Sequence, residues 1–253
     1  AEALTGIATA QAKAGDVKAA FATAKMIEDA DNRAEALTGI ATAQAKAGDV
    51  KAAFATAKMI EDADNRAEAL TGIATAQAKA GDVKAAFATA KTIEDDDNRT
   101  GALTGIATAQ AKAGDVKAAK ETFVQVLATA KTIEDDDIRA EALTGIATAQ
   151  AKAGDVKAAL ATAKTIEDDD YRAEALTDIA TAQAKAGDVN AALATAKTIE
   201  DDDDRAEALA DIATAQAKAG DVKAALATAK TIENVYWRAS ALTDIAEILF
   251  QIK

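Results

Sequence analysis

The sequence predicts an all-α solenoid built from tandem helical hairpins. A segment of 33 residues, AEALTGIATAQAKAGDVKAAFATAKMIEDADNR, recurs along the chain with few changes. Within each copy the apolar residues follow helical spacing, and a glycine–aspartate pair interrupts them once. Self-similarity at this period is typical of arrays in which each repeat packs only on its neighbours.

The copies account for the whole chain. They occupy residues 1–33, 34–66, 67–99, 100–139, 140–172, 173–205 and 206–238, and residues 239–253 repeat only the first half of the unit. The fourth copy is longer because it contains the insertion Lys120–Val126. We therefore predict seven tandem repeats over 1–238 and a terminal capping helix over 239–253.

Each repeat is expected to fold as two helices. One set of residues recurs at i, i+3, i+4 and i+7, the spacing of a single helical face, which predicts a first helix over about 2–14. A second set predicts a helix over about 17–29. In the first copy these sets are Leu4, Ile7, Ala8 and Gln11, then Val17, Ala20, Phe21, Ala24 and Ile27.

The turns carry residues that end and begin helices. Gly15 suits the left-handed position that closes a helix, and Asp16 suits the N-cap of the next. Asp31 is expected to cap the first helix of the following repeat. The acidic stretch around it would then lie at a helix C-terminus, where carboxylates oppose the macrodipole. Arg33 and its equivalents, such as Arg66, Arg99 and Arg139, are expected to pair with these acids across the turn.

The pattern resembles the tetratricopeptide repeat (TPR) family. That family has a bulky residue near the start of its unit, a small residue four positions later, Gly-Asp in the turn and alanine early in the second helix. The matching residues here are Leu4, Ala8, Gly15-Asp16 and Ala20. The resemblance implies a right-handed α-α superhelix whose first helices line a concave groove.

Composition excludes several classes of function. The net charge of −13 and the lack of a basic stripe argue against nucleic acid as a partner. The chain has no histidine, no cysteine and a single serine, Ser240. Its carboxylates and lysines repeat with the scaffold and form no unique constellation. We therefore expect no enzyme activity, no cofactor and no metal. We also expect a soluble protein of unassigned compartment, with the cytoplasm slightly favoured, because no apolar run is long enough to span a bilayer.

Threonine and lysine recur on the face that the resemblance assigns to the groove. A ladder of hydroxyls with a lysine margin could hold an extended peptide, so we predict a protein-interaction scaffold. The alternative is that these residues only solvate a polar helix face. The predicted binding residues are Thr5, Thr9, Thr38, Thr42, Thr71, Thr75, Thr104, Thr108, Thr144, Thr148, Thr177, Thr181, Lys79, Lys112 and Lys152.

The terminal helix suggests a second function. Its residues are unusually apolar for the cap of a solenoid, whose outer face is normally polar. Repeats stacked end to end form open polymers unless the geometry closes, so a self-assembling solenoid is the alternative prediction. The predicted self-association residues are Trp237, Ile248, Leu249, Phe250 and Ile252. They could equally seal only the last hairpin.

The insertion Lys120–Val126 departs from the repeat and marks a possible site. The insertion adds close to two helical turns and is expected to project Phe123, Val124 and Val126 beyond the neighbouring units. They could form a docking knob, but we favour a longer form of the repeat packed on its own hairpin.

Gly6 and its counterparts become aspartate from Asp178 onward. The retained glycines suggest either a close approach or simple copying of the repeat.

The acidic turns are a third departure, growing toward Glu200–Asp204. They could attract a basic partner. A calcium site is not predicted, because the alternating oxygen-ligand loop with its glycine is absent.

Overall fold

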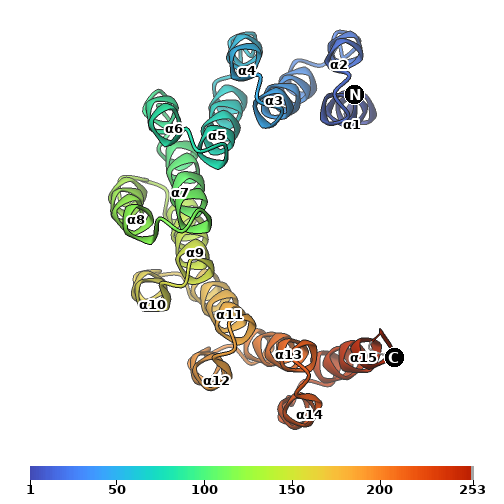
Figure 1. The fold of residues 1–253 in the computed structure, drawn as a ribbon, viewed down its shortest axis with the longest axis vertical. Coiled ribbons are helices and arrows are strands. Elements are labelled where there is room, and N and C mark those ends of the chain that lie inside the picture. The colour runs from blue at the N-terminus through green and yellow to red at the C-terminus, as the bar shows by residue number, and fades with distance from the viewer. Residues whose placement is uncertain (252–253) are drawn as a thin grey trace. The chain divides into compact units, whose positions relative to one another are not determined.

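The computed structural model describes residues 1–251 and consists of helices joined by short turns (Figure 1). It contains two compact units, which meet in the sequence at Glu134 and Asp135. The first unit holds α1 (Glu2–Lys13), α2 (Val17–Ala24), α3 (Ala30–Lys46), α4 (Val50–Ala57), α5 (Ala63–Lys79), α6 (Val83–Ala90), α7 (Asp96–Lys112) and α8 (Val116–Ala130). The second holds α9 (Asp136–Lys152), α10 (Val156–Ala163), α11 (Asp169–Lys185), α12 (Val189–Ala196), α13 (Asp202–Lys218), α14 (Val222–Lys230) and α15 (Val235–Gln251).

The helices form two layers within each unit. We call the odd-numbered helices A helices and the even-numbered ones B helices. Within each unit, successive A helices pack directly on one another, and a B helix packs on the A helix before it and on the A helix that follows it in the same unit. This repeating arrangement confirms the predicted α-solenoid. No helix among residues 1–251 is long and apolar enough to cross a membrane.

Alanine dominates the core. Ala8 and Ala20, from the two helices of the first hairpin, are fully buried. A side chain this small lets helix backbones approach closely. The largest fully buried side chains are isoleucines, such as Ile40 on an A helix and Ile60 in the turn after a B helix. The core is therefore a thin layer between helices, as the composition indicates.

The predicted Gly-Asp turn is confirmed. Gly15 has a φ of 88°, a conformation that favours glycine. Asp16 accepts a 3.0 Å hydrogen bond from the backbone N–H of Ala19 and so caps α2.

The predicted cap at Asp31 is wrong. Asp29 caps α3 instead, by accepting a 2.9 Å hydrogen bond from the backbone N–H of Asn32. As a result α3 begins at Ala30, earlier than the repeat boundary suggested, and α2 ends at Ala24. Asp31 lies in the first turn of α3, where the helix macrodipole favours a negative charge. The acidic stretches thus help to start A helices. The expected repulsion between these carboxylates and the macrodipole at a helix C-terminus therefore does not arise.

The insertion lengthens one B helix. α8 has 15 residues, whereas α6 has 8. Phe123 and Val126 are buried and only Val124 is exposed, at 68%, so the expectation that all three project is wrong for two of them. Thr122 donates a 2.7 Å hydrogen bond to Gln110, as a threonine at this position does in the regular repeats. The added turns therefore continue the existing helix register.

Candidate binding surface on the A helices

The exposed side of the A helices carries two rows of opposite charge. Glu35 lies near the start of α3 and Lys46 at its end, and both are exposed. Eleven residues of helix separate them, or roughly 16 Å. The predicted binding residues Lys79, Lys112 and Lys152 occupy the lysine row and are exposed. No ion pair to a lysine of this row is found within the described part of the chain.

The first row of threonines, which begins at Thr5, forms hydrogen bonds between neighbouring repeats. Thr5 on α1 donates a 3.0 Å hydrogen bond to the backbone carbonyl of Asn32, in the first turn of α3. The pairs Thr38–Asn65, Thr71–Asn98, Thr144–Tyr171 and Thr177–Asp204 repeat this contact at 2.9–3.5 Å. The hydroxyl groups of these predicted binding residues therefore donate hydrogen bonds within the fold. Thr104 lies on α7.

The second row of threonines, which begins at Thr9, packs against glycines of the next A helix in the first unit. A Cβ placed on Gly39 would stand under 3.0 Å from Oγ1 of Thr9. Thr42 and Thr75 meet Gly72 and Gly105 in the same way. Close approach of the A helices therefore accounts for these glycines. Thr108, the next in the row, lies on α7.

In the second unit the same row forms hydrogen bonds. Thr148 donates to Oδ2 of Asp178 at 2.7 Å, and Thr181 donates to Oδ2 of Asp211 at 3.0 Å. The switch from glycine to aspartate thus replaces a steric contact with a charge-assisted hydrogen bond. Across the described pairs, the threonine ladders serve the contact between repeats.

Shallow grooves remain open on the A-helix side. One of about 580 Å³ lies on α1 and is lined by Glu2, Gly6, Lys13 and by Glu35 of α3. Another, of about 340 Å³, lies between α11 and α13. Its lining includes Lys185, Asp211, Thr214 and Lys218. The open surface therefore offers charged side chains more than free hydroxyls.

The second unit concentrates negative charge on this surface. Burial raises the pKa of Glu207, and the nearby carboxylates of Asp211, Asp204, Asp178 and Glu174 raise it further. These residues come from the adjacent helices α11 and α13. No cluster of three metal-ligating side chains occurs among residues that the structure describes.

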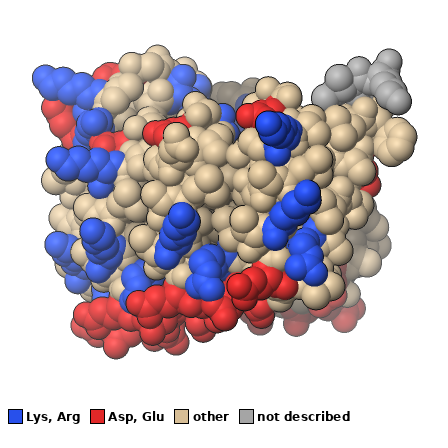
Figure 2. All heavy atoms as spheres, turned by 90° about the horizontal axis from the view of Figure 1, so that it is seen from below, with Lys and Arg blue, Asp and Glu red and all other residues tan. Residues whose placement is uncertain are grey.

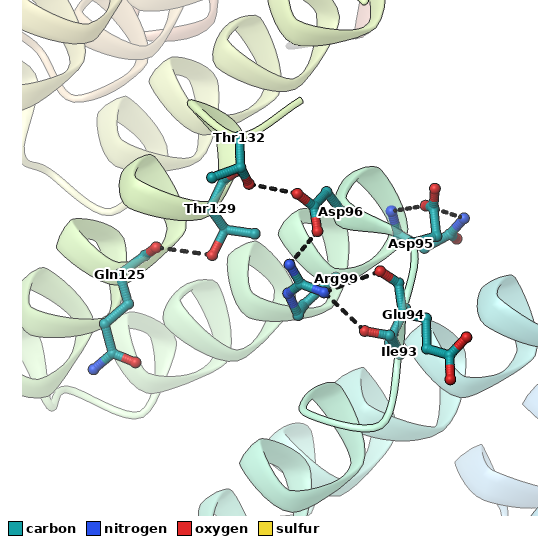
Figure 3. Close-up of polar contacts among 9 residues, drawn as sticks. Ile93, Glu94, Asp95, Asp96, Arg99, Gln125, Thr129 and Thr132 are labelled. Atoms are coloured by element: carbon teal, nitrogen blue, oxygen red, sulfur yellow. Dashed lines mark hydrogen bonds and ion pairs between the residues drawn. The ribbon is translucent and has the colours of Figure 1, made fainter. Parts of the chain in front are cut away.

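The arginine of each acidic turn binds backbone oxygens. Arg99 donates to the carbonyls of Ile93 and Glu94, at the end of the preceding hairpin, at 3.0 and 3.2 Å (Figure 3). Its second nitrogen pairs with Asp96, which also accepts from Thr132. The hydrogen bond from Thr132 and the charge of Arg99 lower the pKa of Asp96.

The expected pairing of arginine with acid therefore occurs at Arg99 and Arg139. Arg33 donates to the carbonyls of Ile27 and Glu28, and this bond to the end of the preceding hairpin was not foreseen. Figure 2 shows acidic side chains gathered along one edge of the molecule.

The predicted self-association residues divide into two groups. Trp237 and Ile248 pack against the core formed by α13 and α14. Leu249 and Phe250 are exposed, at 39% and 76%. Ile252 lies outside the described residues.

One recurring contact was missed by the sequence analysis. Thr56 on α4 donates a 2.6 Å hydrogen bond to Oε1 of Gln44 on α3, and both side chains are buried. The pair recurs in other hairpins, for example as Thr89–Gln77. The available signal was a glutamine on the apolar face of each A helix from α1 to α13, since a buried amide requires a partner.

No family model matches the chain, and no curated protein matches it. Among solved structures, the chain is similar to Ton1535 from Thermococcus onnurineus NA1, with 17% sequence identity and a TM-score of 0.38. That alignment covers 96% of this chain and 99% of the other.

Proposed function

We propose that this protein is a protein-interaction scaffold that holds a peptide or protein segment along the exposed side of its A helices. The observation that carries the proposal is the pair of charged rows, represented by Glu35 and Lys46, which recurs beside open grooves on α1, α3, α5, α9, α11 and α13. On α7, Gly101 stands in place of the glutamate. A segment lying across the repeats would meet carboxylates on one side and ammonium groups on the other.

The proposal modifies the role of the threonines. The hydroxyls of Thr5 and Thr148 already donate within the fold, so the lysine and glutamate rows supply the free polar groups. On α1 to α13 the two charged rows consist of glutamate and lysine and contain no aromatic or arginine anchor of the kind that usually dominates binding energy. We therefore expect modest affinity that falls with added salt, because exposed charges are screened.

We further propose that the repeat is TPR-like. The left-handed Gly15, the cap at Asp16 and the fully buried Ala8 and Ala20 support this assignment. Each occupies a position at which the sequence matches the family pattern.

The test compares matched charge reversals on the two layers. Peptides are selected from a random display library against the intact chain. Their binding is then measured to Lys46→Glu/Lys79→Glu, on the A helices, and to Lys51→Glu/Lys84→Glu, on the B helices. All four lysines are exposed and belong to the first unit. The proposal requires loss of binding in the first variant only; equal binding by the two variants would refute it.

A further inference from the structure

The turns that lead from A helices to B helices carry an excess of positive charge in the first unit. Each of these turns has a lysine on either side of its capping aspartate, as Lys46 and Lys51 flank Asp49. Both lysines are exposed, and the same three residue types recur in all four turns of the unit. The four turns therefore hold eight lysines and four aspartates, a net charge of +4. We call this surface the basic edge.

The turns that lead from B helices to A helices lie at the opposite ends of the same helices, and in the second unit they are strongly acidic. Residues 164–172 and 197–205 form the turns before α11 and α13. Together these two segments hold nine carboxylates, two lysines and two arginines, a net charge of −5. We call this surface the acidic edge.

The negative charge of the acidic edge is not balanced within the fold. Arg172 donates to two backbone carbonyls and pairs with Asp169 alone among the four carboxylates of its turn. Burial raises the pKa of Asp204, and the carboxylates of Asp201, Asp170 and Asp203 raise it further. Carboxylates on this edge therefore repel one another, and a cationic surface placed against them would relieve that repulsion.

The charges on the two edges recur at the same interval. In the first unit Thr5 donates to the carbonyl of Asn32 on the next A helix at 3.0 Å, and in the second unit Thr144 donates to the carbonyl of Tyr171 at 3.1 Å. The same contact thus sets the spacing of the A helices in both units, and packed helices of this kind lie roughly 8–10 Å apart. Each edge presents one charged turn per A helix, so the positive and negative turns match in spacing.

We propose that the basic edge of the first unit binds the acidic edge of the second unit in another copy of this chain. Net charges of +4 and −5 at matching intervals make the two edges complementary. The contact is heterologous, because the two copies contribute different surfaces, and it can continue from copy to copy unless the geometry closes. The basic partner that the acidic turns could attract is then the chain itself.

The range of the charges determines how this association depends on salt. An A helix of 17 residues such as α3 separates the two ends of a unit by about 25 Å. The Debye length is about 10 Å at 0.1 M salt, so only the edges that face one another interact. It is about 30 Å at 0.01 M, where the net charge of −13 on each copy is also felt and opposes contact. We therefore expect association to be strongest near 0.1 M, weaker at lower salt, and absent near 1 M, where facing charges are screened.

Sedimentation velocity at these three salt concentrations, with the chain at submillimolar concentration, tests the proposal. The basic-edge variant reverses three exposed lysines near the starts of B helices and leaves the lysines of the A helices in place, so its effect is independent of the proposed peptide surface. It is Lys18→Glu/Lys51→Glu/Lys84→Glu. We expect it to raise the dissociation constant for self-association by at least about tenfold at 0.1 M salt.

The matched control reverses three exposed lysines at the other ends of the same B helices. It is Lys25→Glu/Lys58→Glu/Lys91→Glu, and it has the same net charge as the basic-edge variant. Because these lysines lie away from the basic edge, the control should still associate. A monomeric wild type at 0.1 M salt, or equal losses in the two variants, would overturn the proposal. Association that strengthens steadily up to 1 M salt would indicate an apolar contact and would also overturn it.

A mixing experiment tests which surfaces meet. Glu167→Lys/Glu200→Lys reduces the charge of the acidic edge from −5 to −1 through two exposed side chains, and this variant alone should be monomeric. Mixed with the basic-edge variant, it should form one-to-one complexes and nothing larger, because each variant keeps one intact edge. Since a complex requires both variants to be folded, the mixture also controls for misfolding. Failure of the mixture to associate, or growth beyond two copies, would contradict the pairing of these two edges.

Discussion

The side chain of Thr9 lies against the bare Cα of Gly39 on the next A helix. A Cβ on Gly39 would approach Oγ1 of Thr9 to under 3.0 Å, and Cγ2 and Cβ of Thr9 lie at 3.1 and 3.2 Å from the same point. Rotating the threonine side chain therefore does not clear the space. Gly6 occupies the same position in the first repeat, but nothing lies within 4 Å of a Cβ placed there.

Alanine at these two glycines should have opposite effects. Gly6→Ala should stabilise the protein by about 0.5–1 kcal/mol, because it removes the conformational entropy cost of glycine within a helix. Gly39→Ala gains the same entropic stabilisation but forces α1 and α3 apart. We therefore expect the free energy of unfolding to fall by about 1 kcal/mol. Urea unfolding of both variants measures the difference. The double variant Thr9→Ala/Gly39→Ala should recover most of the loss, and stabilisation by Gly39→Ala alone would contradict the close approach.

Thr100 should be replaceable with a gain in stability. Its hydroxyl is buried and has no hydrogen-bond partner, while its counterparts Ala34 and Ala67 are buried alanines. An unsatisfied buried hydroxyl costs about 1–3 kcal/mol, and alanine also favours the helix. Thr100→Ala should therefore stabilise the chain by about 1 kcal/mol in thermal or urea unfolding. Thr71→Ala, which removes a bonded hydroxyl, should act in the opposite direction.

The features that the sequence predicted correctly are local. Gly15 and Asp16 act within one turn, so the residue types and their spacing indicate their roles. The cap at Asp29 was missed because Asp29 and Asp31 are both suitable residues, and only the backbone path decides which one precedes the helix.

The role of Thr5 depends on how consecutive A helices are placed. Its acceptor, the carbonyl of Asn32, lies in the next repeat. Spacing within a repeat cannot reveal this partner. For the same reason the sequence assigned the threonine ladders to a ligand, whereas the structure places many of their hydroxyls in contacts between repeats.

The stability contribution of Glu207 should depend on pH. Burial and then neighbouring carboxylates raise its folded-state pKa above the ordinary value of 4.5. The folded protein therefore holds this proton at pH values where the unfolded chain has lost it, and stability falls as pH rises through the folded-state pKa. Glu207→Gln should raise stability near neutral pH, by less than about 1 kcal/mol because the site is largely solvated.

The advantage of Glu207→Gln should vanish below the ordinary pKa, where the carboxyl is protonated in both states. Thermal unfolding across this pH range measures it. The matched control is Glu35→Gln, at the same position of α3, where Gly39 stands in place of Asp211. No gain at neutral pH for Glu207→Gln, or an equal gain for the control, would show that the acidic neighbours do not matter.

Removing the insertion tests whether the stability of the fourth hairpin depends on keeping the apolar side of α8 in register with α7. Deleting Lys120–Val126 joins VKAA to LATA and regenerates the sequence of α10. Seven residues turn a helix through about 700°, only 20° short of two turns, so the apolar side keeps its direction. Thr129 then takes the place of Thr122 opposite Gln110, as Thr162 lies opposite Gln150.

We expect this deletion to fold with its helices intact, at a cost of about 3 kcal/mol for the lost burial of Phe123 and Val126. The control deletion of residues 120–124 removes five residues and misaligns the following turns by about 140°. It should unfold the hairpin, which circular dichroism and urea unfolding would detect. Equal stability of the two deletions would show that α8 does not depend on this register.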